Sequence, residues 1–148
     1  MNTYEVNLKC KENRKGLLIS SVFPKNSKID SPSDLSKSMK GIWSPEHLLL
    51  TSLNSCLMTT FLNKAEKANV QFVSFESSSS CTIDLIKGKP NITGIVLKPK
   101  VVIPFFQNPD DVKYIMEMSK ISCLISNTIK ANIRLEPEIT VELTLLSK

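Results

Sequence analysis

The sequence lacks the features of a membrane, secreted or metal-binding protein. No run of apolar residues approaches the roughly 18 that a membrane-spanning helix requires. The first ten residues have no basic head followed by an apolar segment, so they do not resemble a signal peptide. We therefore expect a cytoplasmic protein without a membrane partner. His47 is the only histidine and no cysteines form a Cys-x-x-C pair, so we expect neither a metal nor another cofactor.

Arginine is almost absent, although the chain is basic. Only Arg14 and Arg134 are arginines among 19 basic residues, and the formal net charge is +5. The lysines are spread along the chain and alternate with acids, without the arginine-rich, aromatic-laced patches of nucleic-acid-binding modules. A solvated basic surface is the simplest interpretation, and we expect no nucleic-acid partner.

Length and composition indicate one ordinary globular domain. The chain has 148 residues, of which 41% are hydrophobic and 22% charged. This is long enough to bury most of its apolar surface around one core, so we expect a single domain over residues 1–148. Repeats and low-complexity tracts are absent.

The hydrophobic pattern predicts an α+β fold with the element order ββ-α-ββ-α-β. A hairpin is expected over 4–23 and a loop over 24–41. A helix begins after the capping residue Ser44 and runs to about residue 68. The other expected elements are strands at 70–86, 92–105 and 133–146 and a helical stretch at 109–130. We expect an antiparallel sheet with the two long helices on one face, and a homodimer that shares the helical layer.

Two of the four cysteines are candidates for redox chemistry. Cys56 lies in the middle of the first predicted helix and is expected to point inward, and Cys123 lies in the second helical stretch. A cysteine attacks a peroxide only as a thiolate, so a neighbouring group must lower its pKa. Arginine suits this role because it stays charged and hydrogen-bonds oxygen. Arg14 stands in the hairpin turn, where a side chain can be projected into a site, and Cys123 is the candidate to capture the oxidised Cys56.

Three segments resemble the OsmC/Ohr family. Ser44-Pro45-Glu46-His47-Leu48, followed by Asn54-Ser55-Cys56, is similar to the family's Pro-Glu-x-Leu segment and to the helix that bears its peroxidatic cysteine. Cys123-Leu124-Ile125-Ser126 is similar to its Cys-Pro-x-Ser signature, with Leu124 in place of the proline. Asn13-Arg14-Lys15-Gly16 resembles the turn that holds its catalytic arginine.

The resemblance implies an intertwined homodimer that reduces organic hydroperoxides. In this chain it makes Cys56 the nucleophile, Cys123 the resolving cysteine and Arg14 the activator of the thiolate. Glu46 orients the arginine, and a dithiol reductant, lipoyl or another thiol, is the implied partner. No cofactor is implied. Ten residues separate Glu46 from Cys56, which is about 15 Å along a straight helix, so the two meet only through a long arginine or across subunits.

An apolar rim around Cys56 is expected to favour organic hydroperoxides over hydrogen peroxide, because an alkyl tail gains burial. Its expected members are Leu49, Leu53, Leu57 and Trp43.

Ordinary roles remain open for each of these residues. Free cysteines often fill cores, Glu46 is also a favourable first-turn acid, and Arg14 suits a solvated turn. Cys10 and Cys81 are expected to be structural, and His47 to be a helix-start residue. Two other functions are open as well: a redox sensor that forms the same disulfide, and a binding module. In the latter, Trp43, Met58 and the pair Phe105-Phe106 would line an apolar pocket.

Overall fold

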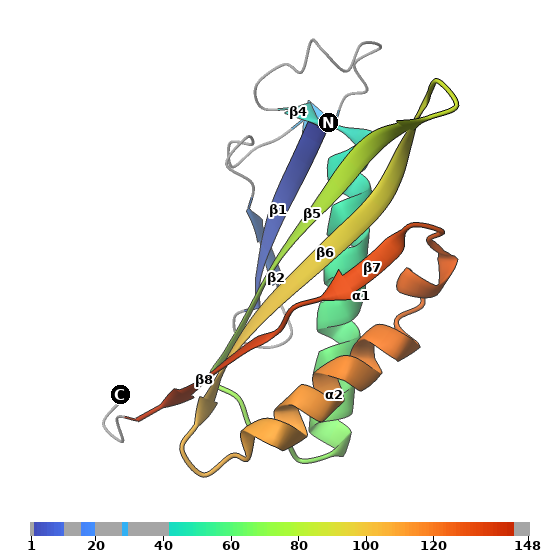
Figure 1. Cartoon of the computed structure of the whole chain (residues 1–148). Helices are drawn as coiled ribbons and strands as arrows, with labels where there is room; N and C mark the ends of the chain where they lie inside the picture. The colour runs from blue at the N-terminus through green and yellow to red at the C-terminus, as the bar shows by residue number, and fades with distance from the viewer. Residues whose placement is uncertain (1, 11–15, 20–27, 30–41, 144–148) are drawn as a thin grey trace.

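The computed structural model describes residues 2–10, 16–19, 28–29 and 42–143 (Figure 1). The elements in chain order are β1 (Asn2–Cys10), β2 (Gly16–Ile19), β3 (Lys28–Ile29), β4 (Ile42–Trp43), α1 (Pro45–Lys67), β5 (Ser74–Ile86), β6 (Lys89–Pro104), α2 (Pro109–Ser122), the 3-10 turn η3 (Ser126–Thr128), β7 (Asn132–Leu135) and β8 (Glu138–Glu142). The fold is α+β, as predicted. The predicted element order is found, except that the short strands β3 and β4 precede α1 and that the last strand is divided into β7 and β8.

The main sheet has the strand order β2-β1-β5-β6-β7, with β8 also paired to β6. Strands β1, β2, β5 and β6 pair antiparallel, and β1 and β2 form the predicted hairpin. The turn of that hairpin, with Arg14, lies outside the described residues. Most of the predicted loop 24–41 also lies outside them, but β3 forms a two-residue parallel pair with β4.

The last part of the sheet differs from the prediction in two ways. The expected strand 133–146 is divided into β7 and β8, because Pro137 has no N–H to donate to a sheet ladder. Both strands run parallel to β6, so the sheet is mixed and not purely antiparallel. The cause is topological. Helix α2 carries the chain from the end of β6 back along the sheet, and such a crossover joins parallel strands.

Helix α1 begins where the sequence predicts. The Ser44 side chain accepts a hydrogen bond from the backbone N–H of His47 at 3.3 Å, and the His47 Nδ1 atom accepts one from the backbone N–H of Ser44 at 3.4 Å. These contacts form a capping box that satisfies N–H groups at the start of the helix. His47 is thus a helix-start residue, as expected. No helix in the described ranges is both long enough and apolar enough to cross a membrane.

Helix α2 ends earlier than predicted. It stops at Ser122, and Cys123 caps it in an extended conformation with φ −67° and ψ 117°. The Ser126 hydroxyl donates to the carbonyls of Lys120 and Cys123 at 2.8 and 2.9 Å, and the Asn127 amide donates to that of Ile121 at 3.0 Å. These side chains replace the N–H donors that a continuing helix would supply. The predicted helix up to residue 130 is therefore wrong.

The core lies between α1 and the sheet, and α2 packs against α1 (Figure 1). Its largest fully buried side chains include Leu53, Leu57, Phe61 and Phe75. Phe61 lies 5.3 Å from Phe75 between ring centroids, which joins α1 to β5. Alternate residues of β5 point into this core, in agreement with the predicted strand periodicity.

A buried polar cluster fixes α1 against the sheet. Asn54 is fully buried, and its amide donates to the carbonyl of Val6 at 3.2 Å and to the hydroxyl of Ser79 at 2.9 Å. It accepts from the Ser77 hydroxyl at 2.8 Å. Buried hydrogen bonds of this kind allow few alternative geometries, so the cluster sets how α1 is rotated. That rotation determines where Cys56, two residues further along, points.

Replacing Asn54 with leucine tests this cluster. The apolar side chain of Asn54→Leu has a similar size but leaves the buried partners Val6, Ser77 and Ser79 without their hydrogen bonds. We expect the free energy of unfolding to fall by about 2–4 kcal/mol. Chemical denaturation measures the change. Ser78→Ala on the opposite face of β5 is the control and should stay within about 0.5 kcal/mol of the parent; equal effects of the two substitutions would contradict the role of Asn54.

Candidate active site

The two candidate cysteines lie where α1 and α2 pack together. Cys56 is half-buried in the middle of α1, and Cys123 is 1% exposed at the C-terminal end of α2. Both are free thiols in this structure. Their side chains are hydrogen-bonded to each other, although they are 67 positions apart in the sequence. The fold therefore brings together the two cysteines that the sequence analysis singled out.

The surroundings of Cys56 favour its thiolate. Burial raises the pKa of Cys56, but hydrogen bonds outweigh this effect, so the pKa lies below its ordinary value. The donors are the thiol of Cys123, the backbone N–H of Ile125, the hydroxyl of Thr60 and the backbone N–H of Leu124, in order of decreasing effect. Thr60 reaches the sulfur because residues four apart lie on one face of a helix.

Cys123 has the opposite tendency. Burial raises its pKa, and the hydrogen bond and charge of Cys56 raise it further. Hydrogen bonds from the backbone and side chain of Ser126 lower the pKa of Cys123 but do not reverse the shift. The pKa of Cys56 is therefore shifted towards easier ionisation than that of Cys123, which donates the hydrogen bond between them. Two coupled thiols with divided roles are suited to the formation of a disulfide.

Glu46 lies apart from the sulfur pair. It is in the first turn of α1, and because α1 is one continuous helix it is about 15 Å from Cys56 along the axis. Its Oε2 atom is buried and has no hydrogen-bond partner among the described residues. Arg14 lies outside the described residues, so the structure does not place the predicted partner of Glu46.

The predicted apolar rim is only partly available to a substrate. Leu53 and Leu57 are 0% exposed and belong to the core, so a substrate has no contact with them in this conformation. Their helical spacing points them towards the sheet. Leu49 is half-buried. Trp43 lies in β4, and its side chain is outside the described set.

The alternative apolar pocket is not formed as expected. Phe105 and Phe106 stack edge-to-face in the loop between β6 and α2 and are exposed, whereas Met58 is buried in the core. The three therefore do not line a common cavity.

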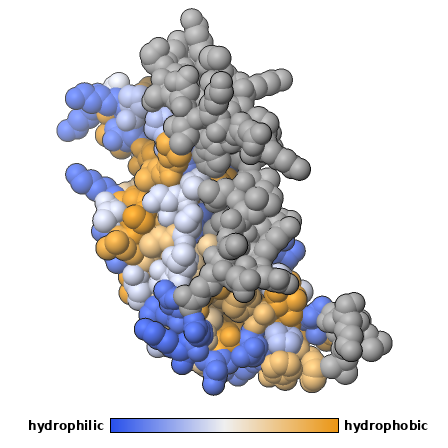
Figure 2. Space-filling model, turned by 180° about the vertical axis from the view of Figure 1, so that it is seen from behind, coloured by the Kyte–Doolittle hydropathy of each residue, from blue (hydrophilic) through white to orange (hydrophobic). Residues whose placement is uncertain are grey.

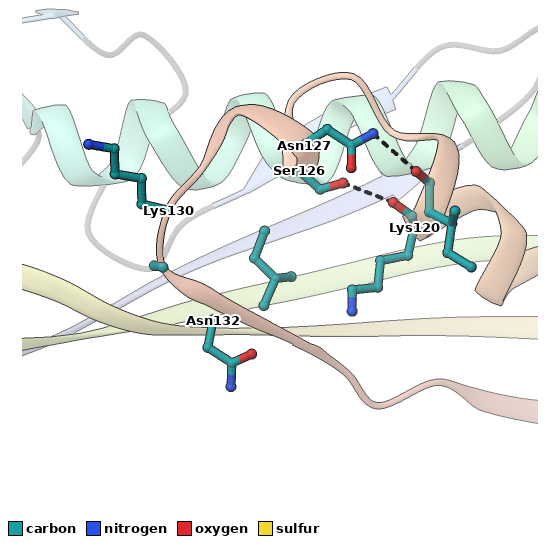
Figure 3. Close-up of a pocket in the computed structure, with 8 residues that line it drawn as sticks. Lys120, Ser126, Asn127, Lys130 and Asn132 are labelled. Atoms are coloured by element: carbon teal, nitrogen blue, oxygen red, sulfur yellow. Dashed lines mark hydrogen bonds between the residues drawn. The ribbon is translucent and has the colours of Figure 1, made fainter.

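A polar groove of about 540 Å³ lies beside the segment that follows Cys123 (Figure 3). Lys120, Ser126, Asn127, Lys130 and Asn132 are among the residues that line it, and neither Cys56 nor Cys123 does. The Ser126 and Asn127 side chains that border the groove are those that end α2 (Figure 3). The groove is thus separate from the sulfur pair, although Ser126 lines the groove and is also hydrogen-bonded to Cys123.

Several large apolar side chains are exposed near the sulfur pair and elsewhere in the described residues. Ile121 and Leu124 flank Cys123, and Leu48 and Tyr114 lie on the two helices. Figure 2 shows apolar residues reaching the surface on the face seen from behind, in patches separated by polar residues.

Sequence reasoning missed three groups that contact Cys56. The contact with Thr60 could have been predicted, because Thr60 is four residues after Cys56 in a predicted helix. The N–H groups of Leu124 and Ile125 have no side-chain signature, because any residue except proline supplies them.

Metal ligands do not cluster in the described part of the chain, where no three His, Cys, Asp or Glu side chains converge.

Comparison with known proteins places the chain in a family. Residues 38–138 match the family model described as "OsmC-like protein", a range that contains Glu46, Cys56 and Cys123. The matched range contains both helices and the two cysteines, and it covers more than half of the chain. The protein belongs to the OsmC-like family.

Individual relatives agree with this assignment. The "uncharacterized protein YmaD" of Bacillus subtilis is 26% identical over 102 residues, which cover 67% of this chain and 68% of YmaD. The solved OsmC-like protein VCA0330 of Vibrio cholerae is 26% identical with a TM-score of 0.58, over 64% of this chain and only 63% of that chain. The organic hydroperoxide resistance protein of Elizabethkingia anophelis is 15% identical with a TM-score of 0.62, over 94% and 97% of the two chains, and shares the fold.

The hydrogen bond between the two thiols generates a prediction for Cys123→Ala. This substitution removes the donor that lowers the pKa of Cys56 most, so the pKa of Cys56 should rise. The pH dependence of alkylation by iodoacetamide, followed on the Cys56 peptide by mass spectrometry, measures the shift. Cys123→Ser keeps a hydroxyl donor and should shift the pKa less. Identical profiles for the parent and Cys123→Ala would show that the thiols do not interact.

Proposed function

We propose that the protein is a thiol peroxidase that reduces organic hydroperoxides. The observation that carries the proposal is the hydrogen-bonded pair of thiols, in which the pKa of Cys56 is lowered and that of Cys123 raised. Membership of the OsmC-like family supports it, because solved proteins of the same fold include organic hydroperoxide resistance proteins.

In the first step the Cys56 thiolate attacks the outer oxygen of the hydroperoxide. An S–O bond forms, the O–O bond breaks, and the departing alkoxide takes up a proton to become an alcohol. Cys56 is thereby oxidised to a sulfenic acid while the peroxide is reduced. The donors around Cys56 lower its pKa and so favour the ionised sulfur that attacks the peroxide.

In the second step Cys123 resolves the sulfenic acid. Its sulfur attacks that of Cys56, an S–S bond forms, and the hydroxyl group leaves as water with the proton of the Cys123 thiol. Oxidation of Cys56 removes the negative charge that raised the pKa of Cys123, so Cys123 deprotonates more readily at the moment it is needed. A dithiol, lipoyl or another thiol, then reduces the disulfide by exchange and becomes oxidised itself.

Arg14 and Glu46 complete the proposed site. An arginine beside Cys56 would stabilise the thiolate further and hydrogen-bond the peroxide. The Oε2 atom of Glu46 is buried and has no hydrogen-bond partner in the described ranges. This supports a cationic partner at that point, because a buried carboxylate oxygen is costly when unpaired. Arg14, with Glu46 to orient it, fits this role within or across subunits, and Glu46→Gln tests it in the assay described below.

The substrate and the assembly are part of the same proposal. Leu49 remains the rim residue that a substrate tail can reach, with Trp43 as a second member, and burial of the tail favours organic hydroperoxides over hydrogen peroxide. The exposed Ile121 and Leu124 support a homodimer, since a second copy would cover them. We place the reaction in the cytoplasm, where a reducing environment regenerates the thiols.

Turnover tests the proposed function. With an excess of dithiothreitol, the chain should consume many equivalents of cumene hydroperoxide, and fewer equivalents of hydrogen peroxide in the same time. Cys56→Ser should abolish consumption, because the substitution removes the sulfur that accepts the hydrogen bonds of Cys123, Thr60, Leu124 and Ile125. Glu46→Gln should lower the rate and keep the fold. Consumption that stops after a single equivalent would instead favour a redox sensor that uses the same disulfide.

A further inference from the structure

Where α2 ends, three successive backbone N–H groups donate to no backbone carbonyl among the described residues. The last backbone hydrogen bond of α2 runs from the Cys123 N–H to the carbonyl of Lys120 at 3.2 Å. The next backbone hydrogen bonds along the chain are donated by the N–H groups of Asn127 and Thr128. Among the described residues, the N–H groups of residues 124–126 therefore donate no backbone–backbone hydrogen bond.

These N–H groups are directed at the two sulfur atoms. Leu124 and Ile125 donate to the sulfur of Cys56, and Ser126 donates to that of Cys123. A turn that follows the resolving cysteine thus holds both sulfurs by its main chain. The Ser126 side chain fixes the turn through its bonds to the carbonyls of Lys120 and Cys123.

We propose that the backbone N–H of Leu124 is a thiolate-binding group of this chain, which with that of Ile125 holds the sulfur of Cys56 as an anion. A hydrogen bond to a charged acceptor is stronger than one to a neutral acceptor, so each N–H favours the ionised form. Cys123 is the titratable group that interacts with Cys56 in the described part of the chain, and no charged side chain there contributes. The role of this N–H in catalysis rests on the proposed function, but the hydrogen bond does not.

The contribution of residue 124 comes from its main chain. The Leu124 side chain is 73% exposed, so its loss removes little packing. Every amino acid except proline supplies the N–H, and proline is the residue that the signature resembled by this segment has at this position. This chain therefore has one donor to Cys56 that a Cys-Pro sequence lacks.

The local backbone makes proline a specific probe. Cys123 has φ −67° and ψ 117°, which is the extended region that a residue before proline prefers. Leu124→Pro is therefore compatible with the conformation of Cys123 and removes the N–H. Leu124→Ala removes the same side chain and keeps the N–H, so it is the matched control.

The test is the pH profile of Cys56 alkylation in the reduced full-length chain, with iodoacetamide as the probe and peptide mass spectrometry to separate the four cysteines. In Leu124→Pro the midpoint should move to higher pH, and the rate below the midpoint should fall several-fold. In Leu124→Ala the profile should match the parent. Overlap of the Leu124→Pro profile with the parent overturns the proposal, and so does an equal shift in both variants.

A measurement on the unaltered chain covers the case in which Leu124→Pro does not fold. In the ¹⁵N-labelled protein, the amide proton of Leu124 should move with pH at the midpoint of Cys56 ionisation, and this movement should vanish in Cys56→Ser. A Leu124 amide signal that ignores the ionisation overturns the proposal.

Both measurements are independent of peroxide. A shifted Leu124→Pro profile in a chain that does not turn over hydroperoxide would leave the thiolate-binding group in place and remove the proposed function. Normal turnover with an unshifted profile would do the reverse.

Discussion

The hydrogen bond between Cys56 and Cys123 is the interaction on which the site depends. It joins the middle of α1 to the end of α2, and it shifts the pKa values of two chemically identical side chains in opposite directions, that of Cys56 down and that of Cys123 up. In this hydrogen bond Cys123 is the donor and Cys56 the acceptor, which is the division that the proposed reaction uses. Other parts of the fold contribute to the site by keeping these two sulfurs in contact.

Two polar devices maintain that contact. The buried Asn54 cluster fixes the rotation of α1 against β1 and β5, which directs Cys56 towards α2. The side chains of Ser126 and Asn127 end α2 early, so that Cys123 is followed by a turn whose N–H groups reach the sulfurs. The Asn54 bonds are buried and those of Ser126 half-buried, and the directional geometry of such bonds suits positioning better than apolar contact does.

Periodicity and capping residues sufficed to predict most of the fold. The start of α1 at Ser44, the hairpin β1–β2 and the α+β class follow from local patterns of three or four residues. The parallel pairing of β7 and β8 and the end of α2 at Ser122 were missed, because the first depends on a crossover and the second on side chains that compete with helix propagation. The pairing of Cys56 with Cys123 rested on family resemblance, since spacing in the sequence does not give a distance. The main-chain donors of residues 124 and 125 have no side-chain signal at all.

The disulfide itself offers the most direct test of the central claim. The reduced chain, treated with one equivalent of cumene hydroperoxide, is digested without reduction, and its cross-linked peptides are identified by mass spectrometry. The account predicts a link between the Cys56 and Cys123 peptides, formed with loss of one equivalent of peroxide. Oxidation of Cys56 to sulfinic acid with Cys123 still free, or a link that involves Cys10 or Cys81, would contradict it.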